Sequence, residues 1–329
     1  MKINFKKCLI IILTIMLSIS LIACNNYNSN KTQNNDNVSE NTIDKATDNV
    51  DTKYPITIKD STGKEITIEK EPEKVVSLAP NATEIIFALG KGDKLAGRTD
   101  YCTYPEDAKK VQSVGDLMNI NYEKLMEIQP DIVITSPMTL EETRKKIADL
   151  GIKVLVIDNT QSFDATYNII EQIGKMLNAN QKSSEIVSSM KEKVESVKKK
   201  VAGADKLKVY YLVSYGESGD YTAGKGTFID SMTEIAGGVN IANDVDSWSK
   251  YSVEKIIEKD PDIIIYSESP DNPINNKESI MAANGYKDIK AVKEGKVMPI
   301  DSDLVEIQGP RLADGLEALA KIIHPELYK

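Results

Sequence analysis

YEKLMEIQPDIVI, residues 122–134, and VEKIIEKDPDIII, residues 253–265, are two copies of one pattern. Seven of the thirteen positions are identical, and most of the others exchange similar residues. In each copy a residue with helix-capping chemistry, Asn121 or Ser252, precedes a short amphipathic run with Glu in its first turn. A Pro-Asp pair then ends the helix, because proline disfavours the helical conformation for the residue before it. The β-branched residues that follow are typical of a strand buried on both faces.

The spacing of the copies indicates two equivalent lobes. They lie 131 residues apart (253 − 122), far longer than the period of a solenoid repeat. A second matched pair, Thr83-Glu84-Ile85 and Thr233-Glu234-Ile235, lies in predicted helices that both end at glycine. Helices and strands alternate around both copies, which predicts parallel sheets. We therefore predict an α/β fold with two Rossmann-like lobes, residues 54–178 and 204–329.

One long helix, within residues 179–203, is predicted to join the lobes. Apolar residues recur at helical spacing along it, and lysine dominates the other face. At 1.5 Å per residue it is roughly 30 Å long, about the size of a lobe. It is either a rigid connection between the lobes or an ordinary surface helix of the second lobe, and we favour the connection.

The first 23 residues are typical of a secretory signal. Three lysines precede an almost uninterrupted apolar run, 8–23, which ends in Leu-Ile-Ala just before Cys24. This ending resembles a bacterial lipobox, so residues 1–23 are predicted to be a lipoprotein signal peptide and Cys24 the lipidated residue. The alternatives are an ordinary signal peptide or an uncleaved anchor.

The next segment, residues 24–53, is predicted to be a disordered tether. It is rich in Asn, Asp, Thr and Ser and cannot bury enough apolar surface to offset its ordering entropy. As a flexible coil it spans roughly 30 Å. The folded body is therefore expected at the extracytoplasmic face of the cell membrane, held there by lipid.

Composition argues against nucleic acid as a partner. The whole chain carries 41 basic and 50 acidic residues, and loss of the three lysines before residue 24 leaves 38 against 50, a balance of −12. The chain has three cysteines, of which Cys24 and Cys102 remain after cleavage. If Cys24 carries lipid, no disulfide forms within the chain.

The residue types also argue against catalysis. The one histidine, His324, lies in the C-terminal tail, so a Ser-His-Asp or Cys-His arrangement has no base. A dedicated zinc cage is equally unsupported. Two carboxylates that match in position, Glu123 and Glu254, belong to different lobes and do not form a hydrolytic pair. We predict that the protein has no catalytic activity and no resident cofactor.

Several segments together carry a family resemblance. PITIKDSTGKEITI (55–68), EPEKVVSLAPNATEIIFALG (71–90), YPEDA (104–108) and both copies of the repeat resemble the metal-chelate-binding lipoproteins of ABC importers. These are the receptors for ferric siderophores, haem and cobalamin. The resemblance covers residues 54–328 and implies the class III periplasmic-binding-protein fold, in which two lobes joined by one long helix hold ligand in a cleft and move little on binding.

The resemblance also implies a role for the repeated glutamates. In this family one glutamate on each lobe docks against arginines of the permease dimer, which works with its ATPase, and Glu123 and Glu254 occupy those positions. The alternative is that each Glu complements its helix dipole, worth under about 1 kcal/mol. Both roles are compatible. We favour docking, because a dipole needs no matched pair.

Ligand candidates follow the predicted strands, since open α/β sheets bind ligands at the carboxyl ends of their strands. The candidates are Tyr101, Tyr221, Trp248, Tyr251, Asp303 and Arg311. By the resemblance, Tyr101, Tyr221 and Trp248 occupy positions where cobalamin receptors place aromatic contacts with the corrin. The sequence departs from those receptors at Leu117 and Ser136, where they carry further aromatic residues.

Other residues keep other chelates open. Arg98 and Arg311 are suited to an anionic siderophore, and Met118 or Met138 either ligates haem iron or packs. Trp248 is predicted to lie on a loop, with its ring turned towards ligand or packed beneath the loop.

The predicted function is therefore capture of a metal chelate, either a cobalamin-type corrinoid or a ferric siderophore, and its delivery to an ABC permease. The alternatives are a haem receptor of the same type, or a surface-tethered enzyme or sensor on the same scaffold.

Overall fold

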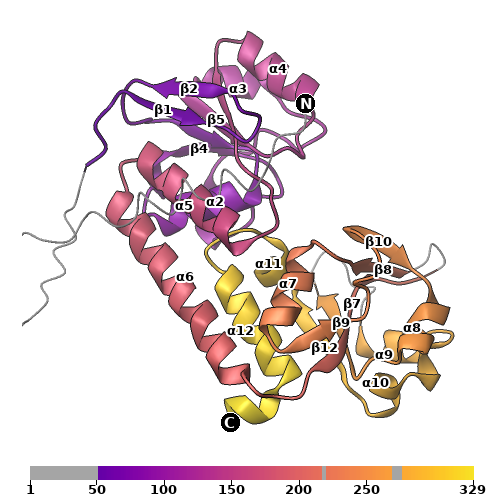
Figure 1. Cartoon of the computed structure of the whole chain (residues 1–329). Helices are drawn as coiled ribbons and strands as arrows, with labels where there is room; N and C mark the ends of the chain where they lie inside the picture. The colour runs from indigo at the N-terminus through magenta and orange to yellow at the C-terminus, as the bar shows by residue number, and fades with distance from the viewer. Residues whose placement is uncertain (1–50, 217–219, 269–275) are drawn as a thin grey trace, which may run out of the picture. The chain divides into compact units, whose positions relative to one another are not determined.

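Two sheets of mainly parallel strands organise the chain (Figure 1). The computed structural model describes residues 51–216, 220–268 and 276–329. The predicted signal peptide, Cys24 and nearly all of the predicted tether lie outside the described residues. Residues Thr47–Lys329 make up one compact unit.

The first sheet forms as the sequence predicts. Its strands have the order β4-β3-β5-β6 and are all parallel. A separate antiparallel hairpin precedes it, with isoleucines buried at alternate positions. The elements of this lobe are β1 Ile56–Lys59, β2 Glu65–Ile68, β3 Val75–Ser77, α2 Pro80–Ala88, η1 Gly92–Lys94, β4 Leu95–Arg98, η2 Glu106–Lys110, α3 Tyr122–Ile128, β5 Ile132–Thr135, α4 Glu141–Asp149, β6 Lys153–Val156 and α5 Phe163–Met176.

The second sheet repeats this topology. The strands β9, β7, β11 and β12 are parallel and have the order of β4, β3, β5 and β6. The duplication predicted from the repeated stretch is therefore confirmed at the level of strand order. The elements of this lobe are β7 Leu207–Ser214, β8 Asp220–Ala223, α7 Phe228–Ile235, β9 Gly238–Asn240, β10 Trp248–Tyr251, α8 Val253–Lys259, β11 Ile263–Glu268, α9 Lys277–Ala282, η3 Tyr286–Asp288, α10 Lys290–Lys293, β12 Val297–Asp301, α11 Ser302–Glu306, α12 Leu312–Ile323 and η4 Pro325–Tyr328.

The second sheet also carries an antiparallel pair that the sequence did not predict. The strand β8 pairs with the end of β7, and β10 pairs with β8. The prediction that Trp248 lies on a loop is therefore wrong, because Trp248 is the first residue of β10. All four residues of β10 pair with β8. A strand of four residues within a polar segment is too short to give a pattern that predicts it from the sequence.

The repeated stretch has the same local structure in both lobes. Asn121 Oδ1 accepts a hydrogen bond from the Lys124 N–H, and Ser252 Oγ accepts one from the Lys255 N–H, as predicted for N-caps. Each helix ends at a residue in the left-handed region, Gln129 (φ 52°) or Asp260 (φ 45°). The proline follows at once, so the helix cannot continue.

The aspartate after each proline accepts a backbone hydrogen bond near the start of the first parallel strand of its lobe, β3 or β7. Asp131 Oδ2 accepts from the Lys74 N–H at 2.9 Å, and Asp262 Oδ2 accepts from the Lys208 N–H at 2.8 Å. Each lysine Nζ in turn donates to a carbonyl at the end of the repeat's helix, Ile128 O or Lys259 O. The C-termini of α3 and α8 therefore lie at the amino ends of the strands, and their N-termini point towards the carboxyl ends.

The predicted long helix forms as α6, Asn180–Val201. It contacts α5 of the first lobe and α12 of the second (Figure 1). One continuous apolar core includes residues of both lobes and of this helix, for example Ile85, Val187, Tyr211 and Leu316. Two smaller cores lie on the other faces of the two sheets. α6 thus connects the lobes through a shared core.

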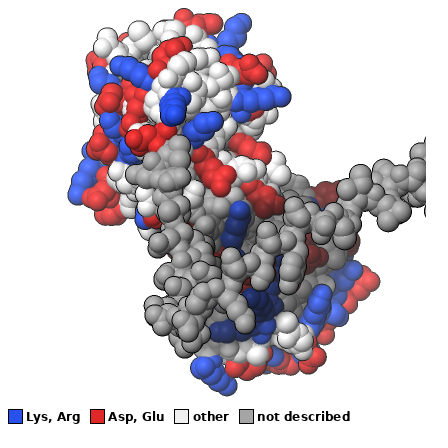
Figure 2. All heavy atoms as spheres, turned by 60° about the vertical axis from the view of Figure 1, so that its left-hand side comes forward, with Lys and Arg blue, Asp and Glu red and all other residues white. Residues whose placement is uncertain are grey.

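Acidic and basic side chains alternate on the visible surface. Figure 2 shows them interspersed on the face that comes forward. Ion pairs between neighbouring elements include Lys91–Glu71 and Lys94–Glu73. Within the described ranges, no helix combines the length and apolar character needed to cross a membrane.

Candidate ligand-binding site

Large apolar side chains are exposed where strands of the first sheet end. Tyr101 and Tyr104 follow β4, and Met138 and Leu140 follow β5. Tyr101 is 61% exposed and Met138 is 69% exposed. Exposed apolar groups that gather at one edge of a sheet mark an interaction site.

Tight turns hold Tyr101 and a further exposed side chain, Met118, outward. Next to Tyr101, the buried Cys102 Sγ lies 3.2 Å from Thr99 Oγ1, which fixes the turn. Met118, 73% exposed, lies on a turn in which Asp116 Oδ1 accepts from the N–H groups of Met118 and Asn119, each at 2.7 Å. Hydrogen bonds from Asn119 and Met118 lower the pKa of the Asp116 carboxyl. The turn therefore keeps its anion while it presents the methionine.

The antiparallel pair of the second lobe carries the predicted aromatic residues. Lys250 lies directly opposite Tyr221, and Trp248 opposite Ala223. Because side chains alternate along a strand, Tyr221 and Trp248 share one face and form a diagonal pair. Tyr221 is 39% exposed, whereas Trp248 is half-buried against the main core. The structure brings these two predicted ligand residues together.

Tyr251 lies on the opposite face of the same strand and is only 2% exposed. Its hydroxyl lies 2.9 Å from Asp244 Oδ1 and 3.1 Å from the Ile241 carbonyl. Burial raises the pKa of this phenol, and the neighbouring Asp244 carboxylate adds to the shift. The geometry therefore gives Tyr251 a packing role and offers a ligand no surface there, contrary to the sequence expectation.

Arg311 joins the two lobes. Its Nη2 lies 2.9 Å from Glu84 Oε2, and its backbone N–H donates to Glu84 Oε1 at 3.3 Å. Its guanidinium carbon lies 3.5 Å from the ring centre of Tyr104, a cation–π contact. Burial raises the pKa of Glu84, while the hydrogen bond and the charge of Arg311 oppose this. Arg311 is thus committed to a partner rather than open to a ligand anion.

Arg98 is committed as well. Its three guanidinium nitrogens donate to the carbonyls of Ala108, Thr99 and Lys109 at 2.8, 2.9 and 3.3 Å. This explains its place at the end of β4, where it closes the loop that carries Tyr101. Arg98 therefore uses all three of its guanidinium nitrogens, whereas Arg311 pairs with Glu84 through Nη2 and has a buried Nε with no hydrogen-bond partner among the described residues.

The helix α11 places carboxyl groups at the carboxyl ends of β7 and β11. Glu306 Oε1 accepts from the hydroxyls of Tyr211 at 2.8 Å and Ser267 at 3.1 Å. Burial raises the pKa of Glu306, and the charge of Asp303 adds to this. Sequence reasoning selected Asp303 and missed Glu306, although both lie in the 301–308 segment and Glu306 follows at helical spacing.

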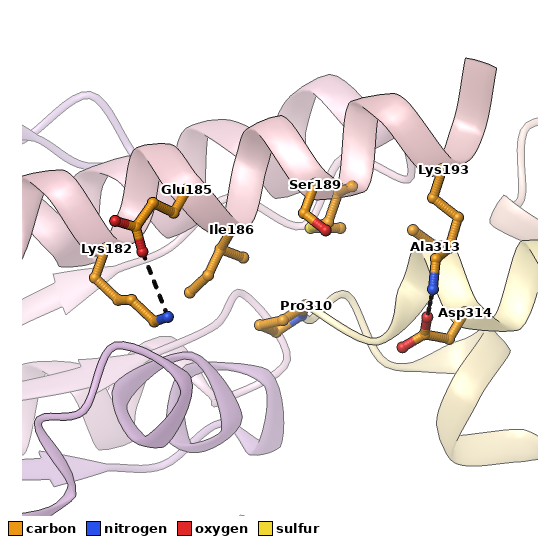
Figure 3. Close-up of a pocket in the computed structure, with 9 residues that line it drawn as sticks. Lys182, Glu185, Ile186, Ser189, Lys193, Pro310, Ala313 and Asp314 are labelled. Atoms are coloured by element: carbon orange, nitrogen blue, oxygen red, sulfur yellow. Dashed lines mark hydrogen bonds and ion pairs between the residues drawn. The ribbon is translucent and has the colours of Figure 1, made fainter. Parts of the chain in front are cut away.

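A groove elsewhere contains none of the predicted ligand residues. It has a volume of about 450 Å³ and lies between α6 and the segment leading into α12 (Figure 3). Figure 3 shows Lys193 on α6 reaching Asp314 on α12, with Pro310 between the elements. These contacts bind α12 to the long helix.

Resident metal ligands are not gathered in the described ranges. No group of three or more His, Cys, Asp or Glu side chains there could hold a metal ion. His324 is buried, with Nε2 3.3 Å from the Gly237 carbonyl and Nδ1 3.2 Å from Glu326 Oε1. These buried contacts give His324 a structural role.

Comparisons with known proteins agree with this geometry. The family model described as periplasmic binding protein matches residues 75–304. The chain belongs to the periplasmic binding protein family. It is therefore a binding protein and not an enzyme, with the class III fold.

Individual relatives are similar over most of the chain. An uncharacterized ABC transporter substrate-binding lipoprotein of Bacillus subtilis, YvrC, is 37% identical over 84% of this chain and 88% of its own length. A cobalamin-binding protein of Halobacterium salinarum is 28% identical over 82% of this chain and 74% of its own. A possible iron-binding solute-binding protein of Staphylococcus epidermidis has a TM-score of 0.69, with 31% identity over 78% of this chain and all of its own.

The repeated glutamates are exposed at equivalent positions. Glu123 and Glu254 lie in the first turns of α3 and α8. Since these helix N-termini point towards the carboxyl ends of the strands, both glutamates lie towards the same sheet edges as the exposed apolar residues.

Proposed function

We propose that this member of the periplasmic binding protein family captures a cobalamin-type metal macrocycle outside the membrane and delivers it to an ABC permease dimer. The observation that carries the proposal is the set of exposed aromatic and methionine side chains at the strand ends. A macrocycle offers broad apolar faces, and each aromatic contact adds about 0.5–1.5 kcal/mol beyond its buried area.

The arginines favour a macrocycle over an anionic ferric siderophore. Of the two arginines expected near the ligand, Arg98 donates to three backbone carbonyls and Arg311 forms an ion pair with Glu84. A chelate with several negative charges would meet Asp303 and Glu306 instead, and like charges repel. Relatives described as cobalamin-binding and vitamin B12-binding proteins support the same choice.

Haem is the second candidate, on one observation. Met118 and Met138 are strongly exposed, and a thioether is a known axial ligand of haem iron. A cobalamin brings its own axial ligands and needs none from the protein. The two candidates therefore differ in whether a methionine binds the metal.

Attachment and docking complete the proposal. We infer that Cys24 is lipidated and becomes the mature N-terminus, with residues 24–53 as tether, in keeping with the relative described as a lipoprotein. We also infer that Glu123 and Glu254 contact the permease. An exposed, matched pair at the sheet edges that carry the candidate ligand residues supports this role.

A binding panel tests the proposed ligand. Isothermal calorimetry with cyanocobalamin, haem and a ferric siderophore is expected to give one-to-one binding of cyanocobalamin, at least about 100-fold tighter than either competitor. Tyr101→Ala should weaken it about 3–10-fold through lost aromatic contact. The matched control is Leu150→Ala, because Leu150 is also exposed but lies at the opposite edge, after α4. Tight binding of haem or siderophore without cyanocobalamin binding would refute the proposal.

A further inference from the structure

Lys250 lies between the two aromatic residues of the second lobe. In β10 it follows Trp248 by two residues, on the same face, and it pairs directly with Tyr221 across to β8. Opposite side chains in such a pair have Cβ atoms about 4.5–5.5 Å apart. Its side chain is exposed, whereas its neighbours Ser249 and Tyr251 face the other way.

The ammonium of Lys250 is not used within the described part of the chain. It takes part in no hydrogen bond or ion pair there, while nearby Lys255 pairs with Asp244 and Lys290 pairs with Asp262. A cation without a partner among the described residues, next to the exposed Tyr221 and the half-buried Trp248, can bind a ligand group without first breaking an ion pair.

The other charges of the site make this cation distinctive. Arg98 and Arg311 are bound to carbonyls and to Glu84, and α11 contributes the carboxyl groups of Asp303 and Glu306. Among these candidate site residues, Lys250 on β10 is thus the cation without an ion-pair partner in the described part of the chain, and the carboxyl groups come from α11. Rings that exclude water next to an ammonium strengthen its attraction for an anion.

We propose that Lys250 binds a single anionic group at the rim of the ligand and so sets the preference among related macrocycles. This rests on the proposed function, because it concerns the same site. Tyr221 and Trp248 contact the apolar face of the macrocycle, and the ammonium reaches the anion at its edge. In a cobalamin that anion is the phosphodiester of the nucleotide loop, and a cobinamide lacks the loop.

The test compares cyanocobalamin with dicyanocobinamide on wild-type protein and on Lys250→Gln. The variant should lose about fivefold to tenfold in affinity for cyanocobalamin and less than about twofold for the cobinamide. Lys250→Arg keeps the charge and should restore cyanocobalamin binding. Raising salt should weaken cyanocobalamin binding to the wild type more than to Lys250→Gln, since salt screens an exposed charge pair. Lys255→Gln is the matched control and should change neither affinity.

The outcomes separate this proposal from the one it rests on. If the wild type binds both corrinoids and Lys250→Gln affects them equally or not at all, the role of Lys250 is refuted while corrinoid capture stands. If the wild type binds neither corrinoid but binds haem, corrinoid capture is refuted. In that case wild type and Lys250→Gln are compared in their affinity for haem and for haem dimethyl ester, which lacks the anions. A loss of affinity for haem alone supports the role of Lys250, and an equal effect on both ligands refutes it. Binding of none of these ligands overturns both proposals.

Discussion

For a single residue, the face of a strand decides whether an aromatic ring meets solvent. Trp248 and Tyr251 are the two ends of one four-residue strand, yet they point to opposite faces. Tyr251 is held in the core by two hydroxyl contacts, whereas Trp248 shares its face with the exposed Tyr221. Both residues are aromatic, so the sequence made them equal candidates for ligand contact. Only the face of the strand on which each lies distinguishes them.

We predict that Trp248→Ala weakens ligand binding about 3–10-fold, from the loss of an aromatic contact. Because the ring also packs against the core, a fall in melting temperature of a few degrees should accompany it. Calorimetry well below the melting transition measures the affinity of the folded protein. As the only tryptophan, Trp248 also reports binding by quenching of its fluorescence.

Tyr251→Phe is the matched control. It removes hydroxyl contacts worth about 1–2 kcal/mol, so its melting temperature should fall by several degrees with affinity intact. If Trp248→Ala shows that same pattern, Trp248 is a packing residue and has no ligand contact.

The partners of Arg98 and Arg311 could not be predicted from the sequence. Only the position of the two arginines after strands was predictable. Arg311 meets Glu84, 227 residues away in the sequence, and Arg98 meets carbonyls of a loop that it closes itself. Glu84 stood out in the sequence only as one member of a matched pair with Glu234, which gives no sign of an arginine partner.

At the scale of the elements, the repeated helix–Pro-Asp–strand unit has a structural role: its hydrogen bonds join a helix and two strands in each lobe. Its aspartate accepts from the backbone at the start of the first strand, and the lysine there binds the end of the helix. Helix, first strand and following strand are thereby joined at one point in each lobe. This gives a structural reason for the repeat that is independent of docking.

We predict that Asp131→Ala destabilises the protein by about 1–3 kcal/mol, because two backbone N–H groups, of Glu73 and Lys74, lose their acceptor. Asp262→Ala should cost less, since it removes the hydrogen bond from the Lys208 backbone N–H and the ion-pair partner of Lys290. Urea unfolding measures both, and neither variant should change ligand affinity. Glu123→Ala, in the same repeat, is the control with little expected loss. Equal stability of Asp131→Ala and wild type would contradict this structural role.

The sequence predicted most elements because their signals are local. Caps, glycine stops and runs of β-branched residues lie within a few positions of each other. Because the pattern occurs twice, the prediction for each lobe also supported the prediction for the other. The pair β8–β10 was not predicted because each strand has only four residues, and because β8 joins β7 beside a register shift. Pairing that depends on a distant partner leaves little local signal.

For the whole molecule, contacts between the lobes occur at helix ends. The carboxylate of Glu84 on α2 accepts the Arg311 N–H at the start of α12, and Gln161 Oε1 accepts the Phe228 N–H at the start of α7. Phe163 packs edge-on against Phe228, with ring centres 6.1 Å apart. Together with the shared core and α6, these contacts oppose large changes in the angle between the lobes. A permease that meets the two lobes therefore meets two glutamates at a set spacing.

We predict that Glu123→Lys combined with Glu254→Lys abolishes ligand uptake by cells while purified protein keeps its affinity within about twofold. In the proposed docking the reversed charges would oppose arginines of the permease, and neither glutamate is among the residues proposed to hold the ligand. Uptake of labelled cobalamin measures the first effect and calorimetry the second.

The control for this double variant is Glu127→Lys with Glu258→Lys. These two exposed glutamates lie on the same helices, α3 and α8, but near their C-terminal ends, away from the carboxyl ends of the strands. The control carries the same change in net charge, so it accounts for any general effect of charge on secretion or solubility. Lysine near a helix C-terminus is also favourable, whereas near the N-terminus it opposes the dipole by up to about 1 kcal/mol. Thermal melts of both variants measure that difference separately. Normal uptake by the first variant, or equal loss in both, would rule out docking through Glu123 and Glu254 and leave the dipole as the reason for their repetition.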